Sequence, residues 1–145
     1  MKVTYVGAQG LPTIQQNVET QKEQALAQFR RILSETKGHF HKIGISSNPT
    51  GRSYGHGKVA VDEREDGDMT YVTLQSGFWA EMHVIYQASS SATIRAAERE
   101  FIALARKEFA DFQVHNLVSM NENPGGEGPL RARGPHFLYV LRSVG

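Results

Sequence analysis

The sequence predicts a single α+β domain, and three observations support this fold class. Two long segments carry apolar residues at a helical period, while several short segments alternate apolar and polar residues or are rich in β-branched residues. These segments do not follow the regular βαβ order that is typical of parallel sheets. Because 145 residues can bury a sizeable core, we expect residues 1–145 to form one domain with a small antiparallel sheet flanked by helices.

The first half of the chain is expected to contain two strands separated by a long helix. Lys2–Val6 and Phe40–Ser46 read as strands, and Thr13–Thr36 reads as an amphipathic helix that covers the sheet. Its apolar residues recur about every 3.6 positions: Ile14, Val18, Ala25, Leu26, Phe29, Ile32 and Leu33. A short helix is expected to begin near Pro49, capped by Ser47 or Asn48.

The second half is expected to contain a β-hairpin, a strand, a second long helix and two further strands. In chain order these are Lys58–Arg64 with Met69–Gln75, then Trp79–Tyr86, Ala92–Asp111, Gln113–Val118 and Pro135–Arg142. Residues 121–129 are rich in Asn and Gly and are expected to form a loop. On the last strand, Phe137, Tyr139 and Leu141 would share one face of the sheet.

The composition excludes several classes of site. The chain has no cysteine, which rules out disulfides, thiolate zinc sites and cysteine nucleophiles, and its six histidines lack metal-ligand spacing. The formal net charge of +1 does not by itself indicate nucleic-acid binding, although a summed charge hides any local patch. No segment resembles a signal peptide or a membrane span, so we expect a cytoplasmic protein with no membrane partner.

Two groups of residues are candidates for chemistry. The first group is cationic: Lys42 is on an expected strand, and Arg52 and His56 are on the expected short helix. Cationic side chains of this kind bind phosphate. Glu98 lies near the apolar face of the second long helix, whereas Glu100 lies closer to its polar face. A carboxylate is the usual protein ligand of Mg²⁺. The competing interpretation is that all of them are ordinary solvated residues, and that Tyr139 is an ordinary core residue.

Together these residues resemble the GIY-YIG endonuclease superfamily, and in particular its phage and bacterial branch whose second motif reads KIG. Lys42-Ile43-Gly44 matches that motif, Arg52 follows ten residues after its first letter, and His56 lies one turn later. The family's metal-binding glutamate lies in a helix with the pattern E-x-x-apolar-apolar, which Glu98-Arg99-Glu100-Phe101-Ile102 matches with Glu98 as the ligand. An asparagine before a GGxG run is matched by Asn121, with Asn123 as second choice.

The sequence departs from the family in the position of the first motif. A G-I-Y-like strand should lie shortly before KIG, but a long helix stands there instead. The last strand resembles the missing one, with Tyr139 as the family's tyrosine. We therefore expect a circular permutation, with an extra N-terminal helix and a β-hairpin insertion. The alternative is that Thr4-Tyr5-Val6 supplies the strand and the helix is an insertion.

The resemblance implies a divalent-metal-dependent DNA endonuclease from a bacterial cell or a phage-infected host. Glu98 would hold Mg²⁺ or Mn²⁺, Arg52 would bind the scissile phosphate, and Asn121 would order the substrate-side loop. Tyr139 would be a candidate base, with His56 or Lys42 lowering its pKa. Because a C-terminal strand can come from a partner chain, both a monomer and a strand-swapped homodimer are expected states.

Two alternatives to the nuclease stay open. One is a catalytically inactive nucleic-acid-binding or regulatory module with the same fold. The other is a protein-interaction domain in which Arg52 and Glu98 form a structural ion pair.

Overall fold

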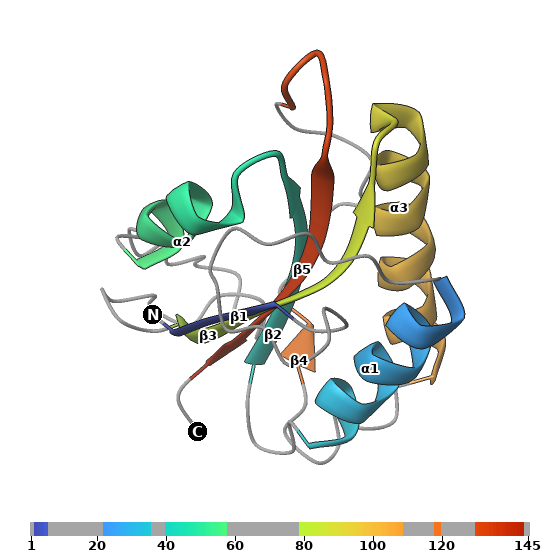
Figure 1. Ribbon diagram of the computed structural model, residues 1–145. Helices are drawn as coiled ribbons and strands as arrows, with labels where there is room; N and C mark the ends of the chain where they lie inside the picture. The colour runs from blue at the N-terminus through green and yellow to red at the C-terminus, as the bar shows by residue number, and fades with distance from the viewer. Residues whose placement is uncertain are drawn as a thin grey trace, which may run out of the picture.

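The computed structural model describes residues 2–5, 22–35, 40–57, 79–108, 118–119 and 130–143. Within these residues the fold is α+β, with one sheet and helices on both of its faces. The strands are β1 (Lys2–Tyr5), β2 (Phe40–Ser46), β3 (Trp79–Ala88), β4 (Val118–Ser119) and β5 (His136–Ser143), and the helices are α1 (Lys22–Ser34), α2 (Pro49–Gly57) and α3 (Ser91–Glu108). Figure 1 shows α2 on one side of the sheet and α1 with α3 on the other.

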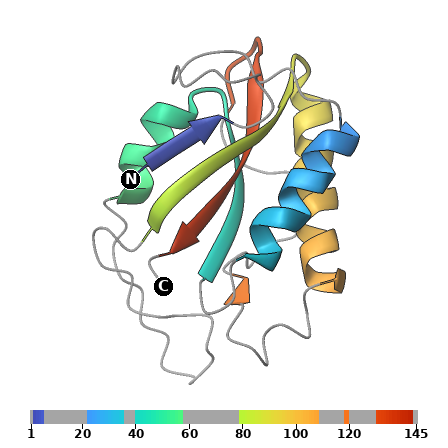
Figure 2. The same ribbon diagram turned by 60° about the horizontal axis from the view of Figure 1, so that its bottom comes forward.

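The sheet has five strands in the order β1-β3-β5-β2-β4, so the last strand of the chain lies at its centre. β5 pairs antiparallel with β2 on one side and with β3 on the other (Figure 2). The expectation of an antiparallel sheet is correct for these three strands and wrong at both edges, where β1 runs parallel to β3 and β4 runs parallel to β2. The sheet is therefore mixed. Parallel pairing needs only a long connection, which periodicity cannot reveal.

The predicted elements correspond closely to those that the structure describes. The strand Phe40–Ser46 has the predicted bounds, while β3 runs two residues beyond the predicted end at Tyr86. Of the two predicted helices, α1 spans Lys22–Ser34 and α3 spans Ser91–Glu108. The β-hairpin Lys58–Arg64 with Met69–Gln75, residues 13–21 and the loop at 121–129 lie outside the described residues.

The short helix α2 forms although it contains three glycines, because its first turn is capped. The Asn48 side chain accepts a hydrogen bond from the backbone N–H of Gly51 at 3.2 Å, and the Asn48 carbonyl accepts one from Arg52 at 3.0 Å. On the far side of the helix, the hydroxyls of Tyr5 and Thr50 lie 3.2 Å apart. These contacts fix α2 against the sheet.

Two hydrophobic clusters cover the two faces of the sheet, and β5 contributes to both. Leu138 and Val140 pack with α1 and α3, which bury the residues Ala25, Phe29, Ile32, Leu33, Ile94, Phe101, Ile102 and Ala105. Phe137, Tyr139 and Leu141 point to the other face and pack with Trp79, Met82 and Val84. The predicted alternation along the last strand is therefore confirmed. No helix in the described part of the chain is long and apolar enough to cross a membrane.

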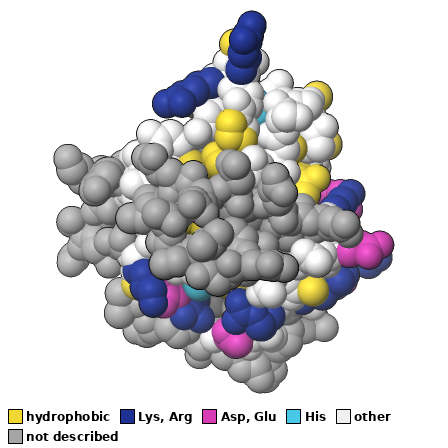
Figure 3. All heavy atoms as spheres, viewed as in Figure 1, with side chains coloured by type: hydrophobic (Ala, Val, Ile, Leu, Met, Phe, Trp, Pro, Cys, Tyr) yellow, Lys and Arg dark blue, Asp and Glu magenta, His cyan; other side chains and the backbone are white. Residues whose placement is uncertain are grey.

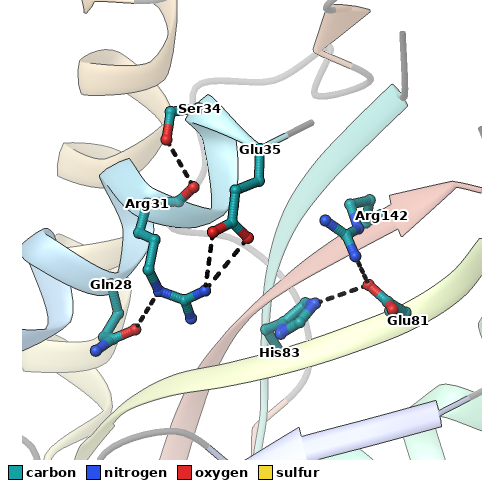
Figure 4. Close-up of polar contacts among 7 residues, drawn as sticks. All are labelled: Gln28, Arg31, Ser34, Glu35, Glu81, His83 and Arg142. Carbon is teal, nitrogen blue, oxygen red and sulfur yellow. Dashed lines mark hydrogen bonds and ion pairs between the residues drawn. The ribbon is translucent and has the colours of Figure 1, made fainter. Parts of the chain in front are cut away.

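A polar cluster lies on the face that α1 and α3 cover. Figure 4 shows Glu81 between His83, whose Nε2 lies 3.1 Å from the carboxylate, and Arg142. Burial raises the pKa of Glu81, but its hydrogen bond to His83 and the charge of Arg142 outweigh burial and lower it. On α1, Arg31 bonds to Gln28 and Glu35 in the same view. These pairs neutralise the charges that border the core at this end.

His41 is buried in β2 with 2% of its surface exposed. Neither ring nitrogen has a hydrogen-bond partner among the described residues. Burial lowers the pKa of His41 to about 4, because the charged imidazolium would lose its hydration in this position. The ring is therefore neutral in the folded protein near neutral pH.

The pH dependence of stability tests this interpretation of His41. The folded-state pKa of about 4 lies below the ordinary value of 6.5, so the unfolded chain takes up the proton first as the pH falls. The contribution to stability is complete above pH 6.5 and is lost as the pH falls through 4, amounting to about 3 kcal/mol. We expect His41→Leu to remove this part of the pH dependence in urea unfolding. Equal pH profiles for wild type and variant would contradict it.

Candidate functional site

Tyr139 is the centre of the candidate site. It lies in the middle of β5, is 2% exposed, and pairs with Gly44 on β2. The absence of a side chain at Gly44 makes room for the phenol ring. A Cβ at this position would lie 2.4 Å from the Tyr139 hydroxyl oxygen and 2.5 Å from Cζ, which is closer than real contacts allow. The phenol ring of Tyr139 therefore packs directly against Gly44, the glycine of the KIG sequence.

Arg52 reaches Tyr139 from α2. Its guanidinium donates a hydrogen bond to the Tyr139 hydroxyl, and Arg52 is exposed to solvent. Arg52 follows the Asn48 cap by one helical turn, so the cap determines where the guanidinium lies. The result is a cationic group at the surface with a phenol directly beneath it.

Glu98 completes the arrangement from α3. It is buried with 7% of its surface exposed, whereas Glu100 is exposed and pairs with Lys22 at 2.5 Å. The apolar residues of α3 pack on the face of Leu138 and Val140, opposite to the Tyr139 ring. The Glu98 carboxylate is nevertheless close enough to act electrostatically on the Tyr139 hydroxyl. Of the three predicted residues, Arg52 and Tyr139 are therefore hydrogen-bonded, whereas Glu98 acts on Tyr139 only through its charge.

The ionisation of Tyr139 differs from the sequence-based expectation. Burial raises the pKa of Tyr139 to about 12; the hydrogen bond and charge of Arg52 oppose this rise, and the Glu98 carboxylate adds to it. A cation, Arg52, does lower the pKa of Tyr139, but the cost of burying a phenolate is larger, so the net shift is upward and not downward. At neutral pH the side chain is a neutral phenol.

The other predicted residues have different positions. Lys42 is half-buried on β2. It lies on the same face as Tyr139, because it is two residues from Gly44 and its pairing partner Leu141 is two residues from Tyr139. His56 lies in α2, but its side chain is outside the described part, as are Asn121 and Asn123. Tyr5 lies on β1, two strands away from β5 in the sheet order. Tyr139, not Tyr5, is therefore on the strand that pairs with Lys42 and Gly44.

A further set of contacts, which is not predicted from the sequence, joins Ser47 to Arg131 and His136. The Ser47 hydroxyl accepts a hydrogen bond from the backbone N–H of Arg131 at 2.9 Å and shares another with Nδ1 of His136 at 2.8 Å. His136 is completely buried, and its Nε2 has no partner among the described residues. The signal in the sequence is the interruption of the β-pattern at Ser47, which predicts a helix cap but not these contacts.

The donor set near Tyr139 fits one kind of metal ion. Within the described ranges, no group of three or more His, Cys, Asp or Glu side chains is close enough to hold a metal together. A single carboxylate is sufficient for Mg²⁺ or Mn²⁺, because these ions retain several water ligands. Glu98, whose charge acts on Tyr139, is the residue that would supply this ligand.

In comparisons with known proteins, no family model, curated protein or solved structure matches this chain.

Gly44→Ala tests the contact between β2 and Tyr139. The new methyl group would overlap the buried phenol, so we expect a loss of about 1 to 3 kcal/mol in the free energy of unfolding, measured with urea. Gly51→Ala is a comparison at a second glycine. Its Cβ would meet the exposed Asn48 side chain at 2.7 Å, so the loss of the Asn48 cap opposes the gain in helix propensity, and no buried ring is displaced. Equal stabilities of Gly44→Ala and wild type would refute the close contact.

The titration of Tyr139 tests the electrostatic arrangement. Glu98→Gln removes a negative charge that raises the pKa of Tyr139, so the pKa is expected to fall. Arg52→Met removes the hydrogen bond and the charge that lower this pKa, so it is expected to rise. The ¹³C shift of the tyrosine Cζ in NMR would report both, with Tyr139→Phe identifying the signal. Shifts of the opposite sign would contradict the geometry.

Proposed function

We propose that this protein is a divalent-metal-dependent DNA endonuclease with a GIY-YIG-like site in a circularly permuted chain. The observation that carries the proposal is the hydrogen bond from Arg52 on α2 to Tyr139 on β5, with the charge of Glu98 on α3 acting on the same hydroxyl. The same three residues match the family's motifs in the sequence. A chance resemblance of motifs would not be expected to bring distant residues into one electrostatic group.

The pairing of β5 supports the permutation. In the family the first motif lies on a strand next to the second, and here β5 pairs antiparallel with β2 so that Tyr139 lies opposite Gly44. Strand pairing depends on register and not on chain order, so a strand from the C-terminal end can take this position. The residues of the site then come from one chain.

In the proposed reaction, the exposed guanidinium of Arg52 binds the scissile phosphate and offsets the charge that develops on it. A Mg²⁺ or Mn²⁺ ion held by Glu98, when bound, would supply further positive charge to the phosphate. Tyr139 presents a neutral hydroxyl, because its pKa is about 12, and this hydroxyl orients the phosphate or a water molecule. Lys42, on the same face, adds to the positive potential.

The second candidate function is a nucleic-acid-binding module of the same fold without catalysis. The observation that favours it is the raised pKa of Tyr139, because a buried phenol with a pKa of about 12 is a weak base at neutral pH. Mn²⁺ binding, followed by water-proton relaxation, separates the two. A nuclease is expected to bind Mn²⁺ through Glu98, whereas the inactive module is expected to bind DNA without the metal.

Plasmid nicking in Mg²⁺ or Mn²⁺ tests the nuclease directly. Glu98→Gln and Arg52→Ala are each expected to reduce the rate by about 100-fold or more, since each removes charge stabilisation at the phosphate. Glu100→Gln is the matched control for the first variant, because Glu100 lies two residues away and is exposed. Arg106→Ala, also exposed on α3, is the control for the second.

Thermal unfolding of each variant would verify that a lost activity does not reflect a lost fold. Equal nicking rates in wild type, Glu98→Gln and Arg52→Ala would refute the proposed site. Equal losses in Glu98→Gln and Glu100→Gln would refute the specific assignment of Glu98.

A further inference from the structure

One end of the sheet is rich in arginine and lacks carboxylates in its described segments. At this end β2 and β3 finish, while α2, α3 and β5 begin. Residues 44–57, 84–97 and 130–140 contain Arg52, Arg95, Arg131 and Arg133 but no Asp or Glu. Figure 3 shows Lys and Arg side chains projecting from the top of the molecule, where β5 begins in Figure 1. The formal net charge of +1 conceals this concentration.

The carboxylates of the described residues lie on α1, α3 and β3, and most of them are neutralised. Glu35, Glu81, Glu100 and Glu108 form ion pairs with Arg31, Arg142, Lys22 and Arg30, respectively. Within the described part of α3, Glu98 is the first acidic residue after the arginine-rich end, and it is buried. The charges are thus separated, with ion pairs around α1 and a positive surface at the other end.

The segment Leu130–Pro135 is held firmly at this end. Its Arg131 backbone is hydrogen-bonded to Ser47, immediately before the helix that carries Arg52. Gly134 lies so close to the turn after β3 that a Cβ would be 2.5 Å from the Ser89 carbonyl oxygen. The segment is therefore attached to both turns that lead into α2 and α3, and its two arginine side chains are exposed.

Two further features add positive potential. The N-termini of α2 and α3 both lie at this end, and each helix dipole contributes a partial positive charge there. The charge of Arg95, in the first turns of α3, acts on the buried His136 at the start of β5 and, after burial, lowers its pKa. Arginine side chains and helix N-termini therefore concentrate positive charge at the end of the sheet where α2, which carries Arg52, begins.

We infer that Leu130–Pro135 is a DNA-backbone clamp, in which Arg131 and Arg133 bind phosphates next to the one that Arg52 binds. The inference rests on the proposed function. The backbone of Arg131 is attached at Ser47, and Arg52 lies five residues further along the chain, a rise of roughly 8 Å at 1.5 Å per residue. Successive phosphates of one DNA strand are spaced by about 3.4 Å along the helix axis, so one backbone spans both positions.

The test measures DNA affinity without cleavage. Anisotropy of a fluorescent DNA duplex in EDTA is recorded against salt concentration for wild type and for Arg131→Ala/Arg133→Ala. Loss of two phosphate contacts is expected to raise Kd by about tenfold or more and to reduce the slope of log K against log salt by about 2. The matched control is Arg106→Ala/Lys107→Ala. It removes two exposed charges from the C-terminal end of α3, roughly 25 Å from the N-terminus of that helix.

The outcomes separate this inference from the proposed function. A selective loss in Arg131→Ala/Arg133→Ala supports the clamp. Equal losses of DNA affinity in both double variants would show that only net charge matters, and would overturn the inference of a clamp. If wild type and Arg131→Ala/Arg133→Ala bind DNA equally, the clamp is refuted and the nuclease proposal stands. If wild type binds no DNA even at low salt, both fail.

Discussion

The antiparallel pairing of β5 with β2 and β3 is the interaction on which the rest of the structure depends. β5 supplies Leu138 and Val140 to the cluster under α1 and α3, and Phe137, Tyr139 and Leu141 to the opposite cluster. Without it the sheet would divide into the pairs β1–β3 and β2–β4, and a two-stranded unit is rarely stable by itself. The same strand brings Tyr139 to Gly44, so the core and the candidate site have a common origin.

The candidate site illustrates a competition between burial and charge. Arg52 stabilises the phenolate form of Tyr139, yet burial and the Glu98 carboxylate favour the phenol and prevail. The arrangement keeps a neutral hydroxyl beneath an exposed guanidinium. A phosphate that approaches this surface would meet the cation first, and the hydroxyl would contribute hydrogen bonding without adding charge.

Local structure could be predicted from the sequence, and the assembly of the sheet could be predicted only in part. Apolar periodicity identified α1 and α3, and the border position of Glu98 on α3 corresponds to its burial. The parallel edges could not be foreseen, because β1 and β4 are short strands whose partners are distant in sequence. The motif resemblance selected Tyr139, Arg52 and Glu98. The pKa of Tyr139 and the anchoring of Arg131 at Ser47 depend on tertiary packing, which spacing does not encode.

The central position of β5 has a consequence for synthesis of the protein. All other described elements precede β5 in the chain, so they leave the ribosome before the strand that joins them. Domains usually fold as units, and here the unit is incomplete until residues 136–143 have emerged. Until then Arg52 and Glu98 have no Tyr139 between them, and the nascent chain cannot form the complete site. The candidate site can therefore form only after β5 has been synthesised.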